Sequence, residues 1–156
     1  AIETFKGFKE YLSKNGEFEK ALKAEKQAEN IEGVVYFDKA STLEEKAGTN
    51  NEVMMIYEMG AEKGNVGCLF NLASIYDDKE KFSEAENYYE QYLSKKPDDY
   101  DAKYNLARVK INLDKEKEAF DLVKEIIPVA PKDDLPELKN ALVEIKEILR
   151  EKNQSK

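Results

Sequence analysis

Apolar residues recur every three or four positions through most of the chain, in blocks that short polar stretches separate. One such block holds Leu69, Leu72, Ala73 and Tyr76. Because this spacing places apolar side chains on one face of a helix, the pattern predicts a series of amphipathic helices and an all-α fold. Only 7 Gly and 4 Pro interrupt the 156 residues, and 37% of the residues are charged, which also favours long exposed helices.

The pattern repeats with an offset of 34 residues. Pro97 and Pro131 stand 34 residues apart, and an Asn-Leu-Ala triplet precedes each of them, at residues 71–73 and 105–107. Several landmarks that share one offset indicate a copied structural unit. A period of 34 residues made of paired helices predicts a solenoid of helical hairpins.

The predicted domain covers residues 1–152 as a single body. Gly16 and Gly48 each stand between two helical patterns, so they mark the turns of two weaker hairpins that precede the strong copies. An Asp-Leu-Pro sequence at residues 134–136 predicts the start of a further helix. The predicted boundaries are 2–33, 34–65, 66–99 and 100–133 for four repeats, 134–152 for a capping helix and 153–156 for a frayed tail.

The third repeat carries a family resemblance, which the fourth repeat copies in most positions. The residues concerned are Asn71, Leu72, Ala73, Tyr76, Phe82, Ala85 and Pro97. In this pattern the chain resembles the tetratricopeptide repeat (TPR) family, and residues 52–76 resemble its Sel-like variant. One departure is Lys110, which stands where the offset from Tyr76 predicts a tyrosine.

The resemblance implies a right-handed α-solenoid of about four antiparallel helix hairpins plus a C-terminal capping helix. In this family the first helix of each pair lines a concave groove, and the usual function is to bind another protein. The resemblance therefore implies a groove in which Phe70 and Tyr104 are apolar anchors and Arg108 orients the ligand. The full predicted groove is Phe70, Asn71, Ser74, Asp77, Asp101, Tyr104, Asn105, Arg108 and Ile111.

Some members of the family clamp a terminal carboxylate with lysine, asparagine and arginine. The corresponding places here are Lys6, Glu10, Asn71, Asp101 and Asn105. Because two of them are acidic, they would repel a carboxylate, and a different ligand is expected.

Charge narrows the class of partner. The formal net charge is −8 and the pI is near 4.8, so nucleic acid would meet net repulsion. Residues 77–101 hold nine Asp or Glu against four Lys, which favours a protein or peptide of basic or mixed charge. No stretch has the length and apolarity of a membrane span.

The sequence gives little support for a catalytic site or a metal site. The chain has no histidine, the most versatile acid, base and metal ligand. Cys68 therefore lacks a histidine to activate it and is predicted to be a buried packing residue. The chain has three clusters of neighbouring carboxylates, and none has the ligand spacing of an EF-hand calcium loop. Two of these clusters directly precede predicted helices, where negative charge offsets the helix dipole. Asp77 and Asp78, at a helix end instead, are the better functional candidates.

The sequence thus predicts a non-enzymatic scaffold with no catalytic, cofactor or metal site. An alternative is a structural oligomer that self-assembles through the solenoid surfaces. Catalysis by paired carboxylates is a third hypothesis, without a recognisable cleft motif. The chain starts at Ala1, and a cytoplasmic location is favoured, with export compatible if a leader was removed before that residue.

Overall fold

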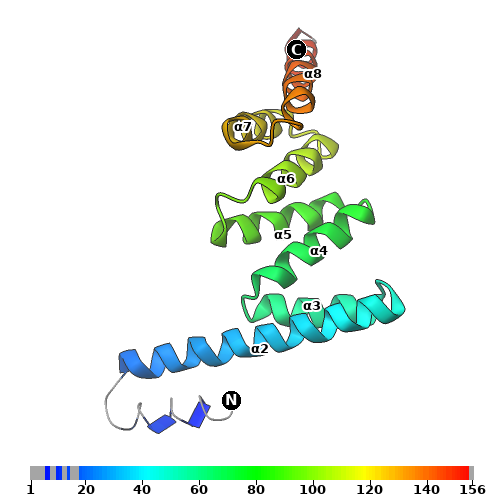
Figure 1. Ribbon diagram of the computed structural model, residues 1–156. Helices are drawn as coiled ribbons and strands as arrows, with labels where there is room; N and C mark the ends of the chain where they lie inside the picture. The colour runs from blue at the N-terminus through cyan, green and yellow to red at the C-terminus, as the bar shows by residue number, and fades with distance from the viewer. Residues whose placement is uncertain (1–5, 8–9, 12–13, 15–17, 155–156) are drawn as a thin grey trace. The chain divides into compact units, whose positions relative to one another are not determined.

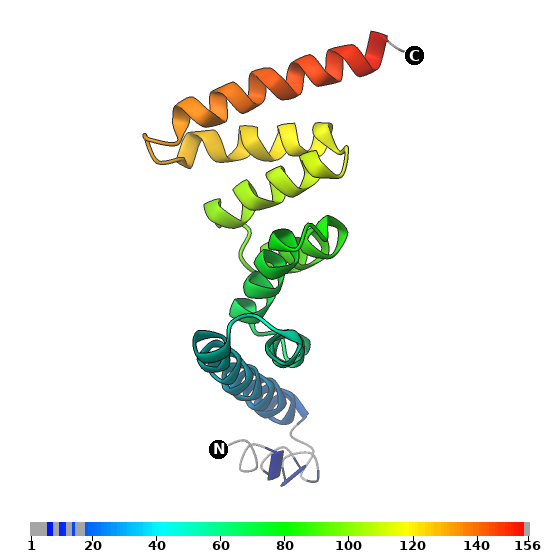
Figure 2. The same ribbon diagram turned by 90° about the vertical axis from the view of Figure 1, so that its right-hand side faces the viewer.

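A computed structural model describes residues 6–7, 10–11, 14 and 18–154, without the side chains of residues 18 and 21. The described part is all-α and holds no strand, which confirms the predicted fold class. None of its helices is long and apolar enough to cross a membrane. The elements are α2 (Phe18–Ala47), α3 (Asn51–Glu62), α4 (Val66–Asp78), α5 (Phe82–Lys95), α6 (Tyr100–Asn112), α7 (Glu116–Ile126), the short 3-10 helix η1 (Ile127–Val129) and α8 (Leu135–Gln154) (Figures 1 and 2).

The chain divides into two compact units, residues 1–72 and 73–156, with the division inside α4. In the first unit α2 packs against α3. In the second unit α6 packs against both α5 and α7, and α8 packs against α7 (Figure 2). Helices that follow one another in the sequence are thus packing partners, as expected for a helical repeat.

Helix α2 is longer than the sequence predicts. It runs without a break for 30 residues, so the predicted boundary between residues 33 and 34 falls inside a continuous helix rather than at a loop. Gly33 lies within this helix, where an added Cβ would lie 3.0 Å from the Asn65 Cβ. Gly33 therefore allows the chain at Asn65 to pack closely against α2. The Gly16 turn and most of the first predicted helix lie outside the described residues.

The predicted turn at Gly48 is confirmed. Gly48 has a φ of +69°, a left-handed conformation that glycine adopts without strain, and it ends α2. The starts of α4 and α6 repeat the 34-residue offset. The side chain of Asn65 accepts a hydrogen bond from the Cys68 amide at 3.0 Å, and that of Asp99 accepts one from the Ala102 amide at 2.9 Å. Equivalent N-caps therefore begin both helices.

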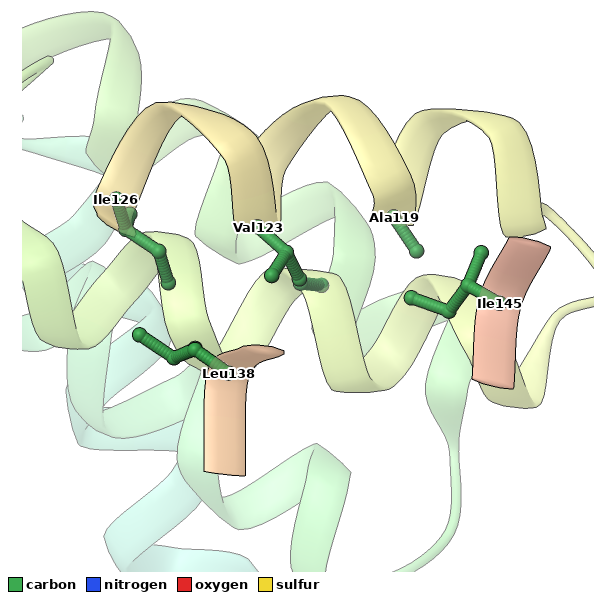
Figure 3. Close-up of a cluster of buried hydrophobic side chains, with 6 residues drawn as sticks. Ala119, Val123, Ile126, Leu138 and Ile145 are labelled. Atoms are coloured by element: carbon green, nitrogen blue, oxygen red, sulfur yellow. The ribbon is translucent and has the colours of Figure 1, made fainter. Parts of the chain in front are cut away.

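Helix α8 covers α7, as predicted for a capping helix. Its Leu138 and Ile145 are buried against apolar residues of α6 and α7, with Leu142 and Leu149 partly buried beside them. Figure 3 shows Leu138 and Ile145 pointing toward the α7 side chains. The buried cluster consists of Ala107, Ala119, Val123, Ile126, Leu138 and Ile145. The helix continues through residue 154, two residues beyond the predicted boundary.

The predicted burial of Cys68 is also confirmed. Its side chain is completely buried in the first unit, and burial raises the pKa of its thiol to about 12. The thiol lies against Gly60 of α3, where an added Cβ would meet the Cys68 Sγ at 2.4 Å. Cys68 is therefore a small packing residue at a close helix contact.

Candidate partner-binding site

A cleft of about 190 Å³ opens between α6 and α8 in the second unit. Three of the nine predicted groove residues, Tyr104, Arg108 and Ile111, line it. Most of its wall is apolar. The complete lining is Tyr104, Ala107, Arg108 and Ile111 from α6, Val123 from α7, and Glu137, Leu138 and Ala141 from α8.

Helical spacing brings the α6 residues to the cleft. Tyr104, Arg108 and Ile111 stand four and three positions apart, which places them on one face of a helix. Ala107 and Ala141 have no side chain beyond Cβ, so the two facing helices leave room between them. Ile111 remains 36% exposed at this opening, which leaves an apolar side chain accessible to a ligand.

Tyr104 is held in place from α8. Its hydroxyl donates a hydrogen bond to the Glu137 Oε1 at 2.6 Å. This hydrogen bond, together with burial, raises the pKa of the Tyr104 phenol. The Tyr104 ring stacks with the Tyr100 ring at a centroid distance of 6.3 Å, and the Tyr100 hydroxyl donates to the Asp134 Oδ2 at 2.8 Å. Both tyrosines of α6 are thus fixed to carboxylates at the start of α8.

Arg108 forms an ion pair with Asp77 of α4. The Asp77 side chain is only 7% exposed, whereas that of Arg108 is 55% exposed. The hydrogen bond to Asp77 raises the pKa of the guanidinium above its ordinary value. The negative charge of Asp77 stands at the unfavourable end of α4, and this ion pair compensates that charge. Asp77 thus fixes the position of the exposed Arg108 guanidinium.

Three other predicted groove residues contact buried tyrosines. Ser74 and Asn105 both hydrogen bond to the hydroxyl of Tyr89, the former at 3.3 Å. In the first unit Asn71 hydrogen bonds to the hydroxyl of buried Tyr57. Asn71 and Asn105 are 34 residues apart and make the same contact in successive repeats. Their amides therefore satisfy buried hydroxyl groups, and none of the three residues lines the cleft.

The last two predicted residues lie apart from the cleft lining. Phe70 is half-buried on α4 and belongs to the first unit. Asp101 is exposed in the first turn of α6. A role of either residue in binding stays a prediction.

Sequence reasoning missed the α8 side of the cleft. Leu138 belongs to the apolar stripe of α8 and Glu137 to its polar face, a pattern that predicts a helix but not a binding surface. Ala141 follows Glu137 by one turn, so the three residues share one edge of α8. The family resemblance places the groove on the first helix of each pair, so it does not point to residues of the capping helix.

A second unpredicted feature is the buried ammonium of Lys110. Its Nζ lies 2.6 Å from Glu86 Oε1, 2.9 Å from Glu90 Oε1 and 2.6 Å from Glu118 Oε2. Burial alone would lower the pKa of Lys110, but the hydrogen bonds to the glutamates outweigh it and raise the pKa. Lys115 contacts the same Glu86 at 2.6 Å. The sequence signal for this ion cluster is Lys110 itself, which stands where the repeat offset predicts a tyrosine.

These glutamates are the one group in the described part of the chain with the spacing of a metal site. The Lys110 ammonium bonds to all three carboxylates. It therefore supplies the positive charge that a metal ion would supply there.

Comparison with known families agrees with the repeat pattern. Residues 78–145 match the family model of the tetratricopeptide repeat. This stretch is a TPR region. It extends from the end of α4 into α8 and includes every residue that lines the cleft. The Sel-like character predicted for residues 52–76 lies outside the match and stays a prediction. A search of curated proteins finds no matching relative.

Proposed function

We propose that this chain is a non-enzymatic scaffold that binds a peptide or helix of a partner protein in the cleft between α6 and α8. TPR regions are protein–protein interaction modules, and the cleft lies wholly within the TPR region. The observation that carries the proposal is an apolar cleft that keeps Ile111 accessible between Tyr104 and Arg108. Tyrosine and arginine are enriched among residues that dominate binding energy.

The size of the cleft favours a peptide over a small molecule. Pockets for small molecules have volumes of roughly 300–1,000 Å³. A cleft of about 190 Å³ accommodates one or two side chains of a longer ligand. Of the two anchors expected from the sequence, Phe70 and Tyr104, only Tyr104 lines this cleft, so Ile111 takes the second anchoring role in the proposal.

A peptide-display selection against the full chain tests the proposal. Random dodecapeptides are selected, resynthesised with a fluorescent label and measured by anisotropy. Ile111→Ser is expected to weaken binding about tenfold, because it removes an apolar contact worth roughly 1.4 kcal/mol. The matched control is Val143→Ser on α8, a 55% exposed valine outside the cleft lining, which should leave the affinity unchanged. Equal affinities for both variants would contradict the proposal.

Self-assembly is a second candidate function, favoured by one observation in the first unit. Met55 and Met59 stand one turn apart on α3 and are 63% and 44% exposed. Neighbouring exposed apolar residues of this kind mark association surfaces. Light scattering over a dilution series should then show a mass that rises with concentration, and Met55→Ser with Met59→Ser should abolish the rise. A constant monomer mass would exclude this candidate.

A further inference from the structure

We infer that the peptide bound in this cleft carries a lysine or arginine three residues from a large apolar side chain. The inference rests on the proposed function and specifies the chemistry of its partner. It follows from the charges at the two ends of the cleft and from the distance between them.

The Tyr104 end of the cleft is acidic. Glu137 lines the cleft there and is exposed, and Asp134 lies close by, bonded to Tyr100. Tyr100 and Tyr104 contact these two carboxylates through neutral hydroxyl groups, which add no positive charge. The nearest lysine on α6, Lys103, is paired with Glu125 at 2.8 Å. A cationic side chain of a ligand therefore meets a carboxylate at this end.

Arg108, the one arginine among the residues that line the cleft, does not make the cleft favourable for an acidic ligand. Arg108 is ion-paired with the nearly buried Asp77, which compensates its charge from behind. An acidic ligand would gain little from a compensated guanidinium and would face Glu137. The net charge of −8 adds long-range attraction for a basic partner.

The other end of the cleft is apolar and presents Ile111. Tyr104 and Ile111 are seven residues apart on α6, which corresponds to about 10 Å at a rise of 1.5 Å per residue. An extended peptide advances about 3.3 Å per residue, so three residues span the same distance. The aliphatic stem of the ligand lysine can then lie along Ala107 and Leu138 while its ammonium reaches Glu137.

The selected peptides test this inference by their composition. Lysine or arginine should be enriched three positions from leucine, isoleucine, methionine or phenylalanine. In a synthetic peptide with this pattern, replacement of the lysine by norleucine keeps the stem and removes the charge. This replacement should weaken binding to the unaltered chain roughly fivefold to tenfold, as expected for an ion pair next to an aromatic ring.

A charge-neutral variant assigns the effect to one residue. Glu137→Gln keeps an oxygen that accepts the Tyr104 hydrogen bond but removes the carboxylate charge. The lysine and norleucine peptides should bind this variant within twofold of each other. Glu144→Gln, an exposed position of α8 outside the cleft lining, is the matched control and should retain the full preference for lysine.

The outcomes separate this inference from the proposed function. If no selected peptide depends on Ile111, the proposed function fails and the inference falls with it. If the peptides depend on Ile111 but are enriched in acidic or uncharged residues, the cleft is a binding site and the inference alone is overturned. A preference for lysine that survives Glu137→Gln also overturns it.

Discussion

Glu80 and Asp114 are 34 residues apart and have nearly the same backbone conformation, with φ of 57° and 58°. Each follows the first helix of a pair. The amide of the residue that follows donates a hydrogen bond to a carbonyl oxygen of the preceding helix. Lys81 N donates to Tyr76 O at 2.8 Å, and Lys115 N donates to Lys110 O at 2.9 Å. This is the hydrogen bond of a Schellman turn, which normally has glycine at the left-handed position. The same turn therefore ends two helices with strained residues.

We predict that Glu80→Gly stabilises the protein. A left-handed conformation costs a non-glycine residue about 1–2 kcal/mol, and the greater freedom of unfolded glycine offsets part of that gain. The free energy of unfolding in urea should rise by about 0.5–1 kcal/mol. As a control, Glu84→Gly inside α5 should lower it by about 1 kcal/mol, since glycine is a poor helix former. A loss of stability in Glu80→Gly would show that the turn is not strained.

The offset of 34 also relates Lys110 to Tyr76, although the two residues have different surroundings. The Tyr76 ring stacks with the Tyr88 ring at a centroid distance of 5.6 Å and an interplanar angle of 6°. Lys110 instead lies among glutamates, with 5% of its side chain exposed. One backbone position thus supports an aromatic contact in one repeat and an ionic contact in the next.

We predict that Lys110→Met destabilises the second unit strongly. Methionine fills a similar volume but leaves Glu86 buried with only Lys115 as a partner. Removal of one partner of a buried ion pair costs about 3–5 kcal/mol, and the exposure of Glu90 and Glu118 places the expected loss near the lower value.

Two further variants identify the cause of that loss. Lys117→Met, at an exposed position of α7, should change the free energy of unfolding by less than about 0.5 kcal/mol. Adding Glu86→Gln to Lys110→Met should restore part of the loss, since it removes the uncompensated charge. Equal losses at Lys110 and Lys117 would show that the ion cluster does not stabilise the fold.

The offset in the sequence was sufficient to predict much of the second unit. Local signals in the second unit, such as helix caps and apolar stripes, agree with the elements that the offset predicts. Asp99 caps α6, and the apolar stripe of α8 contains Leu138 and Ile145. The predicted boundary between residues 33 and 34 falls inside α2, because a repeat period places a boundary without showing whether the helix is interrupted there. Gly48 has a positive φ, whereas Gly33 packs against Asn65 within a helix.

The candidate site was predicted less completely than the fold. The resemblance to the TPR family was sufficient to group Tyr104, Arg108 and Ile111, which share one face of α6. It did not show that Asn105 on the same helix contacts a buried tyrosine hydroxyl, since this depends on α5. It also did not show that Glu137 faces Tyr104, because the angle at which a capping helix packs has no simple sequence signal.

We predict that stability falls in acid through Glu86. Burial alone would raise the pKa of Glu86, but hydrogen bonds from Lys110 and Lys115 outweigh it and hold the pKa below its ordinary value of 4.5. The folded state therefore binds fewer protons than the unfolded state. The stabilisation is fully present above the unfolded pKa and is lost as the pH falls through the lower folded pKa.

Urea unfolding across pH 7 to pH 3 checks this prediction. Glu86→Gln should be less stable than the unaltered chain at pH 7, and the difference should shrink as the pH falls below 4.5, the ordinary pKa of glutamate, because the carboxylate of the unaltered chain takes up a proton. Glu90→Gln, at a more exposed position, should show a smaller effect at pH 7. A difference that stays constant with pH would contradict the predicted ionisation of Glu86.

We predict that Gly60→Ala destabilises the first unit through a collision with Cys68. The new Cβ would lie 2.4 Å from the Cys68 Sγ, well inside contact distance. Overpacking of this kind costs about 1–3 kcal/mol. Cys68→Ala alone should cost less, because it removes only the buried sulfur atom. In the double variant the collision partner is gone, so the loss should be smaller than the sum of the two single losses. Strictly additive losses in urea unfolding would show that α3 moves away from Cys68 instead of packing against it.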